Sequence, residues 1–195
     1  DTNIDLVRKL ISAMDLSCVK PHVLFSSSTQ EERDNVFGKS KREGRQLLAA
    51  WAERSGATFT GMVIPNVFGP FGNPYYNSVV ATFSHQLTHN EQPKIEVDAQ
   101  LKLIYVGDLV RIIHYLIKNR VADNQFAIIP TDEARVSELL MLLQSFRAQY
   151  LEEGIIPDLS DPFERNLFNT FVSYLDHSRF FPHKLKLSTD DRGSF

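Results

Sequence analysis

A lysine and an aromatic residue stand one helical turn apart in the first quarter of the chain, shortly after a run of hydroxyls. Phe37 and Lys41 are spaced i and i+4, so on a helix they share one face and point at the same place. Ser27 and Ser28 stand at the end of an apolar run, nine residues or more upstream. An ammonium beside hydroxyls can hold an oxygen and change the pKa of a neighbouring acid, which is the chemistry of proton transfer.

The same residues also have an ordinary structural interpretation. Serines at the end of a strand commonly make local hydrogen bonds, and a lysine on a helix commonly lies on its solvated face. Only the register between the two segments gives Lys41 a special meaning. Cys18 has no motif around it, and we interpret it as filler and not as a nucleophile.

The elements that must position these residues alternate between strand and helix. Apolar runs predict strands at 23–28, 58–64, 103–106 and 126–129, with a short polar strand at 94–97. Amphipathic patterns predict helices at 4–14, 37–55, 78–88, 107–117, 136–151 and 163–174. This alternation indicates an α/β chain whose parallel sheet is covered on both faces.

Ligands of such sheets bind beyond the carboxyl ends of the strands. Three of the predicted strand ends carry polar or turn-forming residues, namely 26–28, 65–66 and 106–108. We therefore expect the site at this edge. The segment 68–77 is dense in Gly, Pro and Asn, which predicts a loop of special backbone geometry, and loops of this length are usually functional.

The composition excludes several classes of function. The chain has 195 residues, 43% of them hydrophobic, and a formal net charge of −3 with no basic run, so we expect neither a nucleic-acid surface nor an anionic-membrane surface. No apolar stretch approaches the ~20 residues of a membrane-spanning helix. A single cysteine rules out an internal disulfide, and the six histidines lack a third ligand at matching spacing, so no metal site is expected.

Several motifs in order resemble one known family. Val-Leu-Phe-Ser-Ser-Ser-Thr-Gln stands at 23–30, Asp-Asn-Val-Phe-Gly-Lys-Ser-Lys at 34–41, Ile-Pro-Asn-Val-Phe-Gly-Pro at 64–70, and Tyr-Val-Gly-Asp at 105–108. Together they resemble the extended short-chain dehydrogenases/reductases, also known as the NAD-dependent epimerase/dehydratase family. Within it, the similarity is to reductase domains of capsular-polysaccharide and O-antigen enzymes. Residues 189–195 resemble the junction at which such reductases pass into a cupin domain.

The resemblance implies roles for individual residues. The family's catalytic tyrosine aligns with Phe37, which keeps the ring and has no proton to transfer. Ser28, or alternatively Ser27, would orient the substrate, and Lys41 would bind the nicotinamide ribose and tune the acid. The other implied contacts are Pro65 and Val67 with the nicotinamide, Asn66 with the sugar or its phosphates, and Tyr76, Asn77 and Ser78 with the sugar nucleotide. Lys102 stands near the place where many relatives hold the diphosphate with an arginine.

The family also implies a fold and an activity. Residues 1–130 would be the C-terminal part of a Rossmann-like, doubly wound sheet with a substrate-loop insertion at about 70–100, and 131–195 a mostly helical substrate-binding lobe. The expected function is NADPH- or NADH-dependent reduction, epimerisation or dehydration of a nucleotide-linked keto-deoxyaminosugar, impaired by Phe37, in a cytoplasmic homodimer. The alternative is a non-catalytic sugar-nucleotide-binding or assembly module. No Gly-x-x-Gly-x-x-Gly phosphate loop occurs in the chain, which begins without methionine and is expected to lack the family's first strands.

Overall fold

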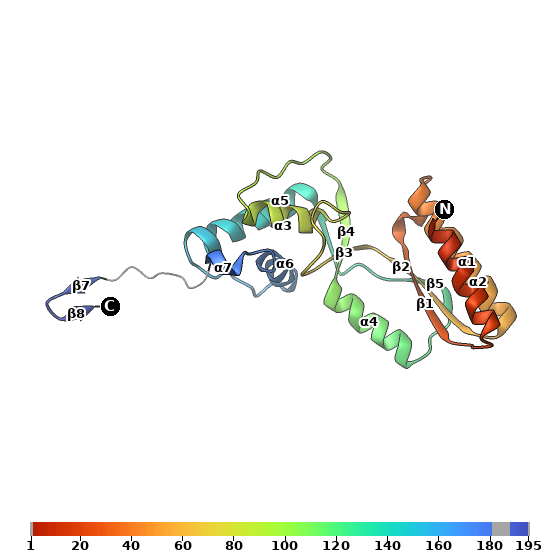
Figure 1. Cartoon of the computed structure of the whole chain (residues 1–195). Helices are drawn as coiled ribbons and strands as arrows, with labels where there is room; N and C mark the ends of the chain where they lie inside the picture. The colour runs from red at the N-terminus through yellow and green to blue at the C-terminus, as the bar shows by residue number, and fades with distance from the viewer. Residues whose placement is uncertain (1, 181–187, 195) are drawn as a thin grey trace. The chain divides into compact units, whose positions relative to one another are not determined.

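The computed structural model describes residues 2–180 and 188–194, and the chain divides into two compact units (Figure 1). The first unit comprises Asp1–Gly69 and Glu96–Leu139, and the second comprises Pro70–Ile95 and Leu140–Phe195. The first unit is built from α1 (Thr2–Leu16), β1 (His22–Ser28), the short 3-10 helix η1 (Thr29–Glu32), α2 (Val36–Ser55), β2 (Thr58–Ile64), β3 (Asn66–Phe68), β4 (Gln100–Tyr105), α4 (Val106–Lys118), β5 (Asp123–Ala127) and β6 (Asp132–Arg135).

A parallel sheet in the order β1-β2-β5 forms the centre of the first unit. Successive side chains of a strand point to opposite faces. Phe59 of β2 therefore packs with Leu48 and Trp51 of α2, while Met62 and Ile64 of the same strand pack with Leu109 and Leu116 of α4. The sheet has helices on both faces, which confirms the predicted α/β class.

The expectation that residues 103–106 belong to this sheet is wrong. A second sheet has the order β3-β4-β6, with β4 parallel to β3 and antiparallel to β6. Pro65 separates β2 from β3, and because proline has no N–H to donate, the ladder of β2 stops there. The chain then resumes as β3 beside β4, and the predicted edge of three strand ends is divided between two sheets.

Other differences concern short or polar strands. The predicted strand at 94–97 does not form, and Val97 in it is largely exposed. β5 begins at Asp123, three residues earlier than predicted. β3 was not predicted because it has only three residues, and β6 was not predicted because it has no apolar run. These strands exist through pairing with neighbours, which local sequence does not reveal.

Helix α2 matches its prediction closely because both of its ends carry sequence signals. The Asn35 side chain caps the first turn by accepting from the Gly38 N–H at 2.7 Å. Gly56 ends the helix in the left-handed region at φ 70°, where glycine costs least. A Cβ on Gly38 would lie 2.3 Å from the carbonyl oxygen of Gln30, so the first turn of α2 rests directly on η1.

The second unit is helical and contains α3 (Val79–Thr88), most of α5 (Val136–Phe146), a π-helical turn (Arg147–Glu152), α6 (Pro162–Val172), α7 (His177–Phe180) and the two-residue strands β7 (Thr189–Asp190) and β8 (Gly193–Ser194). Phe146 stacks edge-on with Phe168 and lies near Phe171, which joins α5 to α6. The helix predicted at 136–151 is α-helical only to Phe146 and continues as a π-helical turn. In the ranges described, no helix is long and apolar enough to cross a membrane.

Candidate functional site

Three consecutive serines end β1, and each is bonded to a different partner. The backbone oxygen of Ser26 accepts from Lys41 Nζ at 3.0 Å. The hydroxyl of Ser27, which is 4% exposed, donates to Glu31 Oε2 at 2.5 Å. Ser28 Oγ caps η1 by accepting from the Gln30 N–H at 3.2 Å, and a hydroxyl that accepts one bond still has a proton to donate.

Lys41 and Phe37 lie side by side on the first turns of α2, as their spacing predicts. Lys41 Nζ is 5.7 Å from the ring centroid of Phe37 and 5.5 Å from that of Phe25. Burial lowers the pKa of the Lys41 ammonium. Phe37 is 41% exposed, so its ring is accessible from solvent. A phenol at position 37 would have a partly buried positive charge next to it.

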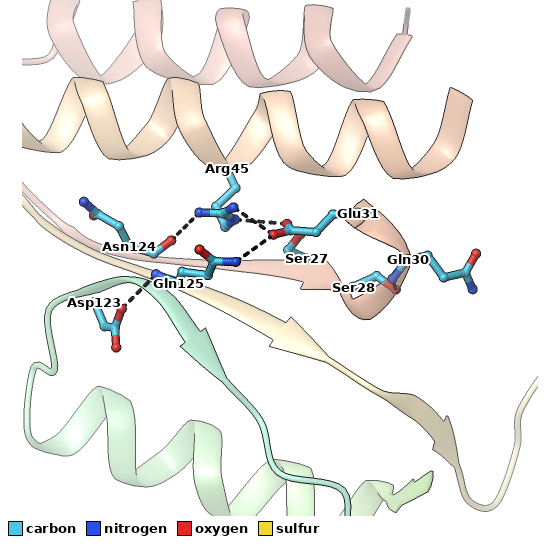
Figure 2. Close-up of polar contacts among 8 residues, drawn as sticks. All are labelled: Ser27, Ser28, Gln30, Glu31, Arg45, Asp123, Asn124 and Gln125. Carbon is cyan, nitrogen blue, oxygen red and sulfur yellow. Dashed lines mark hydrogen bonds and ion pairs between the residues drawn. The ribbon is translucent and has the colours of Figure 1, made fainter. Parts of the chain in front are cut away.

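A hydrogen-bonded group that we call the polar junction comprises Ser27, Glu31, Arg45, Gln125 and the backbone oxygen of Asn124 (Figure 2). Arg45 Nε and Nη2 donate to the two oxygens of Glu31 at 3.0 and 2.7 Å. Arg45 Nη1 donates to the Asn124 oxygen at 2.8 Å, and Gln125 Nε2 donates to Glu31 at 3.3 Å. The junction links η1, α2, β1 and β5.

The charges of the polar junction are buried, since Glu31 is 2% and Arg45 8% exposed. Burial alone would raise the pKa of the Glu31 carboxyl. The hydrogen bonds from Arg45 and Ser27, with the charge of Arg45, outweigh it and the pKa lies below its usual range. Glu31 is therefore held as a carboxylate, paired with Arg45.

Sequence reasoning missed Glu31 and Arg45, although two signals point to them. Arg45 follows Phe37 and Lys41 at the same i+4 spacing, so the three share one helix face. Gly61 is the second signal, because a glycine inside a strand often marks the close approach of another group. A Cβ there would lie 2.7 Å from Arg45 Cδ and 2.5 Å from the Asn124 oxygen, so the arginine stem crosses β2 over Gly61.

The residues expected to line the nicotinamide and the diphosphate lie on β3, on β4 and just before β3. Pro65 is buried, whereas Asn66 and Val67 are exposed. Asn66 Nδ2 donates to the backbone oxygen of Lys102 at 3.0 Å, and the Lys102 side chain is exposed. The ladder between β3 and β4 thus brings Asn66 and Lys102 together, as neighbours in one sheet.

The expected sugar-nucleotide residues Tyr76, Asn77 and Ser78 belong to the second unit. Tyr76 is exposed, and Asn77 has φ 57°, in the left-handed region. Ser78 Oγ accepts from the Ala81 N–H at 3.3 Å and caps α3, so part of its bonding capacity is structural. The three residues immediately precede α3, with Ser78 as its N-cap, and Tyr76 and Asn77 are both exposed.

Two histidines of the second unit, His85 and His89, stack on each other. His85 and His89 have ring centroids 4.0 Å apart, and Tyr75 contacts His85 edge-on. Within residues 2–180 and 188–194 no group of three or more His, Cys, Asp or Glu side chains could hold a metal ion. Tyr75 O–H donates to the carboxylate of Glu91, which fixes one end of the loop before α3.

Comparison with known proteins relates this geometry to enzymes of sugar nucleotides. Residues 1–129 match the NAD dependent epimerase/dehydratase family. A reductase from Pseudomonas aeruginosa, named UDP-2-acetamido-2,6-beta-L-arabino-hexul-4-ose reductase, is 30% identical over 175 residues, which are 89% of this chain and 46% of the relative. The chain spans about half the length of this relative.

Solved structures show the same similarity. The crystal structure of the capsular polysaccharide assembling protein CapF from Staphylococcus aureus superimposes with a TM-score of 0.85 at 34% identity, covering 96% of this chain and 52% of CapF. RMD from Pseudomonas aeruginosa complexed with NADPH has a TM-score of 0.72 at 15% identity, covering 88% of this chain and 73% of RMD. At that identity the second likeness concerns the fold.

Proposed function

Because this chain belongs to the NAD dependent epimerase/dehydratase family, we propose that it forms the nicotinamide-facing and sugar-facing part of a nucleotide-sugar reductase. The observation that carries the proposal is the placement of Lys41 Nζ, 3.0 Å from the Ser26 oxygen and beside the ring at position 37. The names of the relatives support a UDP-linked hexul-4-ose as the substrate class and capsule synthesis as the setting, with O-antigen synthesis as the other setting that the sequence motifs suggest. A cytoplasmic homodimer using NADPH or NADH belongs to the same proposal.

The residues present fit one end of a nicotinamide cofactor. Lys41 has three N–H donors, and the bond to Ser26 uses one of them, so a ribose hydroxyl would find a donor there. Val67 is exposed and would offer an apolar surface for the ring, whereas Pro65 is buried. The glycine-rich loop that holds a pyrophosphate has no counterpart in this sequence, so the fit covers the nicotinamide and its ribose only.

The hydroxyl at the end of β1 would hold the substrate carbonyl. A bound reduced nicotinamide would supply the hydride to the carbonyl carbon, and the oxygen would then need a proton. Between the two candidate serines, the bonding favours Ser28, because the Ser27 proton is already donated to Glu31. Ser28 would donate to the substrate oxygen, and the Lys41 charge would stabilise negative charge that develops there.

Because Phe37 has no hydroxyl, this reaction would lack the proton donor that a tyrosine at the same position would supply. A positioned general acid contributes about 10²–10⁴ in rate, so turnover should be slow by roughly that factor even with both ligands bound. The phenyl ring would still fill the space of the phenol and could contact the sugar.

The test is to restore the phenol with Phe37→Tyr in the full-length protein as its gene encodes it, and to follow nicotinamide absorbance with a UDP-linked 4-keto sugar. We expect kcat to rise by about 10²–10⁴. Phe37→Leu is the matched control, since it changes the ring without adding a proton donor and should give no increase. An unchanged rate in Phe37→Tyr would contradict the proposal that this is the site of reduction.

The same phenylalanine favours a second candidate function, a sugar-nucleotide-binding or assembly module without chemistry. Such a module should bind a UDP-sugar in calorimetry with no cofactor added. In that case Phe37→Tyr would leave affinity and turnover unchanged. A reductase would show the gain in turnover given above.

A further inference from the structure

We propose that Glu31 and Arg45 are a positioning pair, which holds the turn that carries Ser28 against the helix face that carries positions 37 and 41. This inference rests on the proposed function and adds two residues to its site. Neither side chain would touch substrate, since both are buried. Their effect would pass through the placement of Ser28 and Lys41.

The first argument is the reach of the pair. Glu31 lies in η1, three residues after Ser28, and Arg45 lies one helical turn after Lys41. Nε, Nη1 and Nη2 of Arg45 all donate, two to the Glu31 carboxylate and one to the Asn124 oxygen on β5. Figure 2 shows the guanidinium between the carboxylate and that strand. One planar group therefore fixes η1, α2 and β5 relative to one another.

The second argument is the room made for the pair. Arg45 passes over Gly61, where any larger residue would strike its stem, and Gly38 lets the first turn of α2 rest on the Gln30 and Arg33 oxygens. These contacts leave little freedom for η1 to move along α2. The Ser27 hydroxyl, bonded to Glu31, adds β1 to the same assembly.

The third argument is energetic. Buried ion pairs lose much of their attraction to desolvation, and apolar residues of similar volume often serve stability as well or better. What a bidentate arginine–carboxylate pair supplies is a fixed geometry. A displacement of η1 would move Ser28 away from position 37, and a shift of the first turns of α2 would move Lys41 from the Ser26 oxygen.

The experiment uses a phenol at position 37 as a local probe of Lys41. In the chain carrying Phe37→Tyr, the ionisation of the introduced phenol is isolated from the six native tyrosines by ultraviolet difference titration against the parent chain. A nearby ammonium lowers a phenol pKa by about 1–3 units from its ordinary value near 10. Circular dichroism at each pH verifies that the chain stays folded.

Three variants are added to that background. Arg45→Lys keeps the charge but loses the fork, and the double variant Glu31→Met with Arg45→Met removes both charges so that no buried charge is left unpaired. Arg54→Met is the matched control, because Arg54 is on the same helix in an exposed pair with Asp15. We expect the phenol pKa to rise by about one unit in the double variant, by less in Arg45→Lys, and not at all in the control.

A phenol pKa that is the same in all folded variants, whatever happens to their melting temperatures, would show that the pair is only structural and overturn the proposal. The proposal would also be overturned if the phenol of the Phe37→Tyr parent titrated near its ordinary pKa, since Lys41 would then not affect the group at position 37. The titration needs neither cofactor nor sugar. A failure to reduce sugars would therefore count against the proposed function and leave this result standing.

Discussion

The two halves of α2 make different kinds of contact. The first half carries Phe37, Lys41 and Arg45, and its polar partners beyond the helix are the Glu31 carboxylate and the backbone oxygens of Ser26 and Asn124. The second half carries Leu48, Trp51 and Ala52, which pack on Val7, Met14 and Phe59; we call these six residues the apolar cluster. Both halves pack on the same sheet, but the ion pair of the first half, Arg45 with Glu31, is buried, whereas that of the second half, Arg54 with Asp15, is exposed.

The difference indicates that the two halves of α2 have separate roles, one in stability and one in orienting the site. Apolar burial stabilises in proportion to area and does not depend on direction, whereas hydrogen bonds to charged groups depend strongly on geometry. The apolar cluster should therefore account for most of the stability. The polar junction should account for the orientation of the residues at the end of β1.

Truncating the centre of the apolar cluster should give the largest loss of stability. Trp51 is 0% exposed, and its Nε1 donates to Asp15 at 2.7 Å. We expect Trp51→Ala to lower the free energy of unfolding by about 3–5 kcal/mol, measured by urea denaturation. Leu10→Ala on the exposed face of α1 is the control and should cost under ~0.5 kcal/mol. A similar loss in both would mean that the apolar cluster is not the main source of stability.

Removing the cap of the polar half should cost less. Asn35 accepts from the Gly38 N–H, and we expect Asn35→Ala to lower the free energy of unfolding by about 1 kcal/mol in the same assay. Asn35→Ser keeps a capping oxygen and should stay near the parent. If Asn35→Ala cost as much as Trp51→Ala, the two halves would not differ in the way we describe.

The smallest expected effect on stability depends on pH and concerns His22, the first residue of β1. His22 Nε2 donates to Thr60 Oγ1 at 2.7 Å, since the Thr60 proton goes to the Val121 oxygen, and Nδ1 has no partner within the described residues. Burial first, and then the charge of Arg120, lower the pKa of His22 from 6.5. The folded state thus binds this proton less readily than the unfolded chain.

Stability should therefore fall as the pH drops below about 6.5, towards the lower pKa of the folded state. Thermal unfolding between pH 7.5 and 5 measures this slope. In His22→Asn the part of the slope due to this residue should disappear. An unchanged slope would mean that His22 titrates alike in the folded and unfolded chains.

Much of the first unit could be predicted from sequence because its signals are local. Asn35 and Gly56 mark the ends of α2, and the apolar runs of β1 and β2 predict a parallel sheet. The strand predicted at 94–97 does not form, because the described structure gives these residues no neighbouring strand to pair with. The polar strand β6 was missed for the opposite reason, since its partner β4 defines it.

The candidate site was predictable in part. The i+4 spacing placed Lys41 beside Phe37, and the strand end placed the serines next to the lysine. Sequence could not tell Ser27 from Ser28, because the choice depends on Glu31 turning back four residues to accept the Ser27 proton. Nor could it reveal a buried arginine, since most arginines on a helix are solvated.

The loop before α3 combines a strained backbone with exposed aromatic side chains. Phe71 and Tyr75 have φ values of 65° and 60°, where glycine or asparagine costs less, and they are 88% and 60% exposed. An engineer seeking a more heat-resistant chain would replace Phe71 with glycine and relieve the backbone there, but would keep Tyr75, which bonds to Glu91 and contacts His85. The change at position 71 would remove one of the exposed rings of the loop. Raising thermal stability through the backbone of this loop and keeping its exposed aromatic surface are therefore competing design goals.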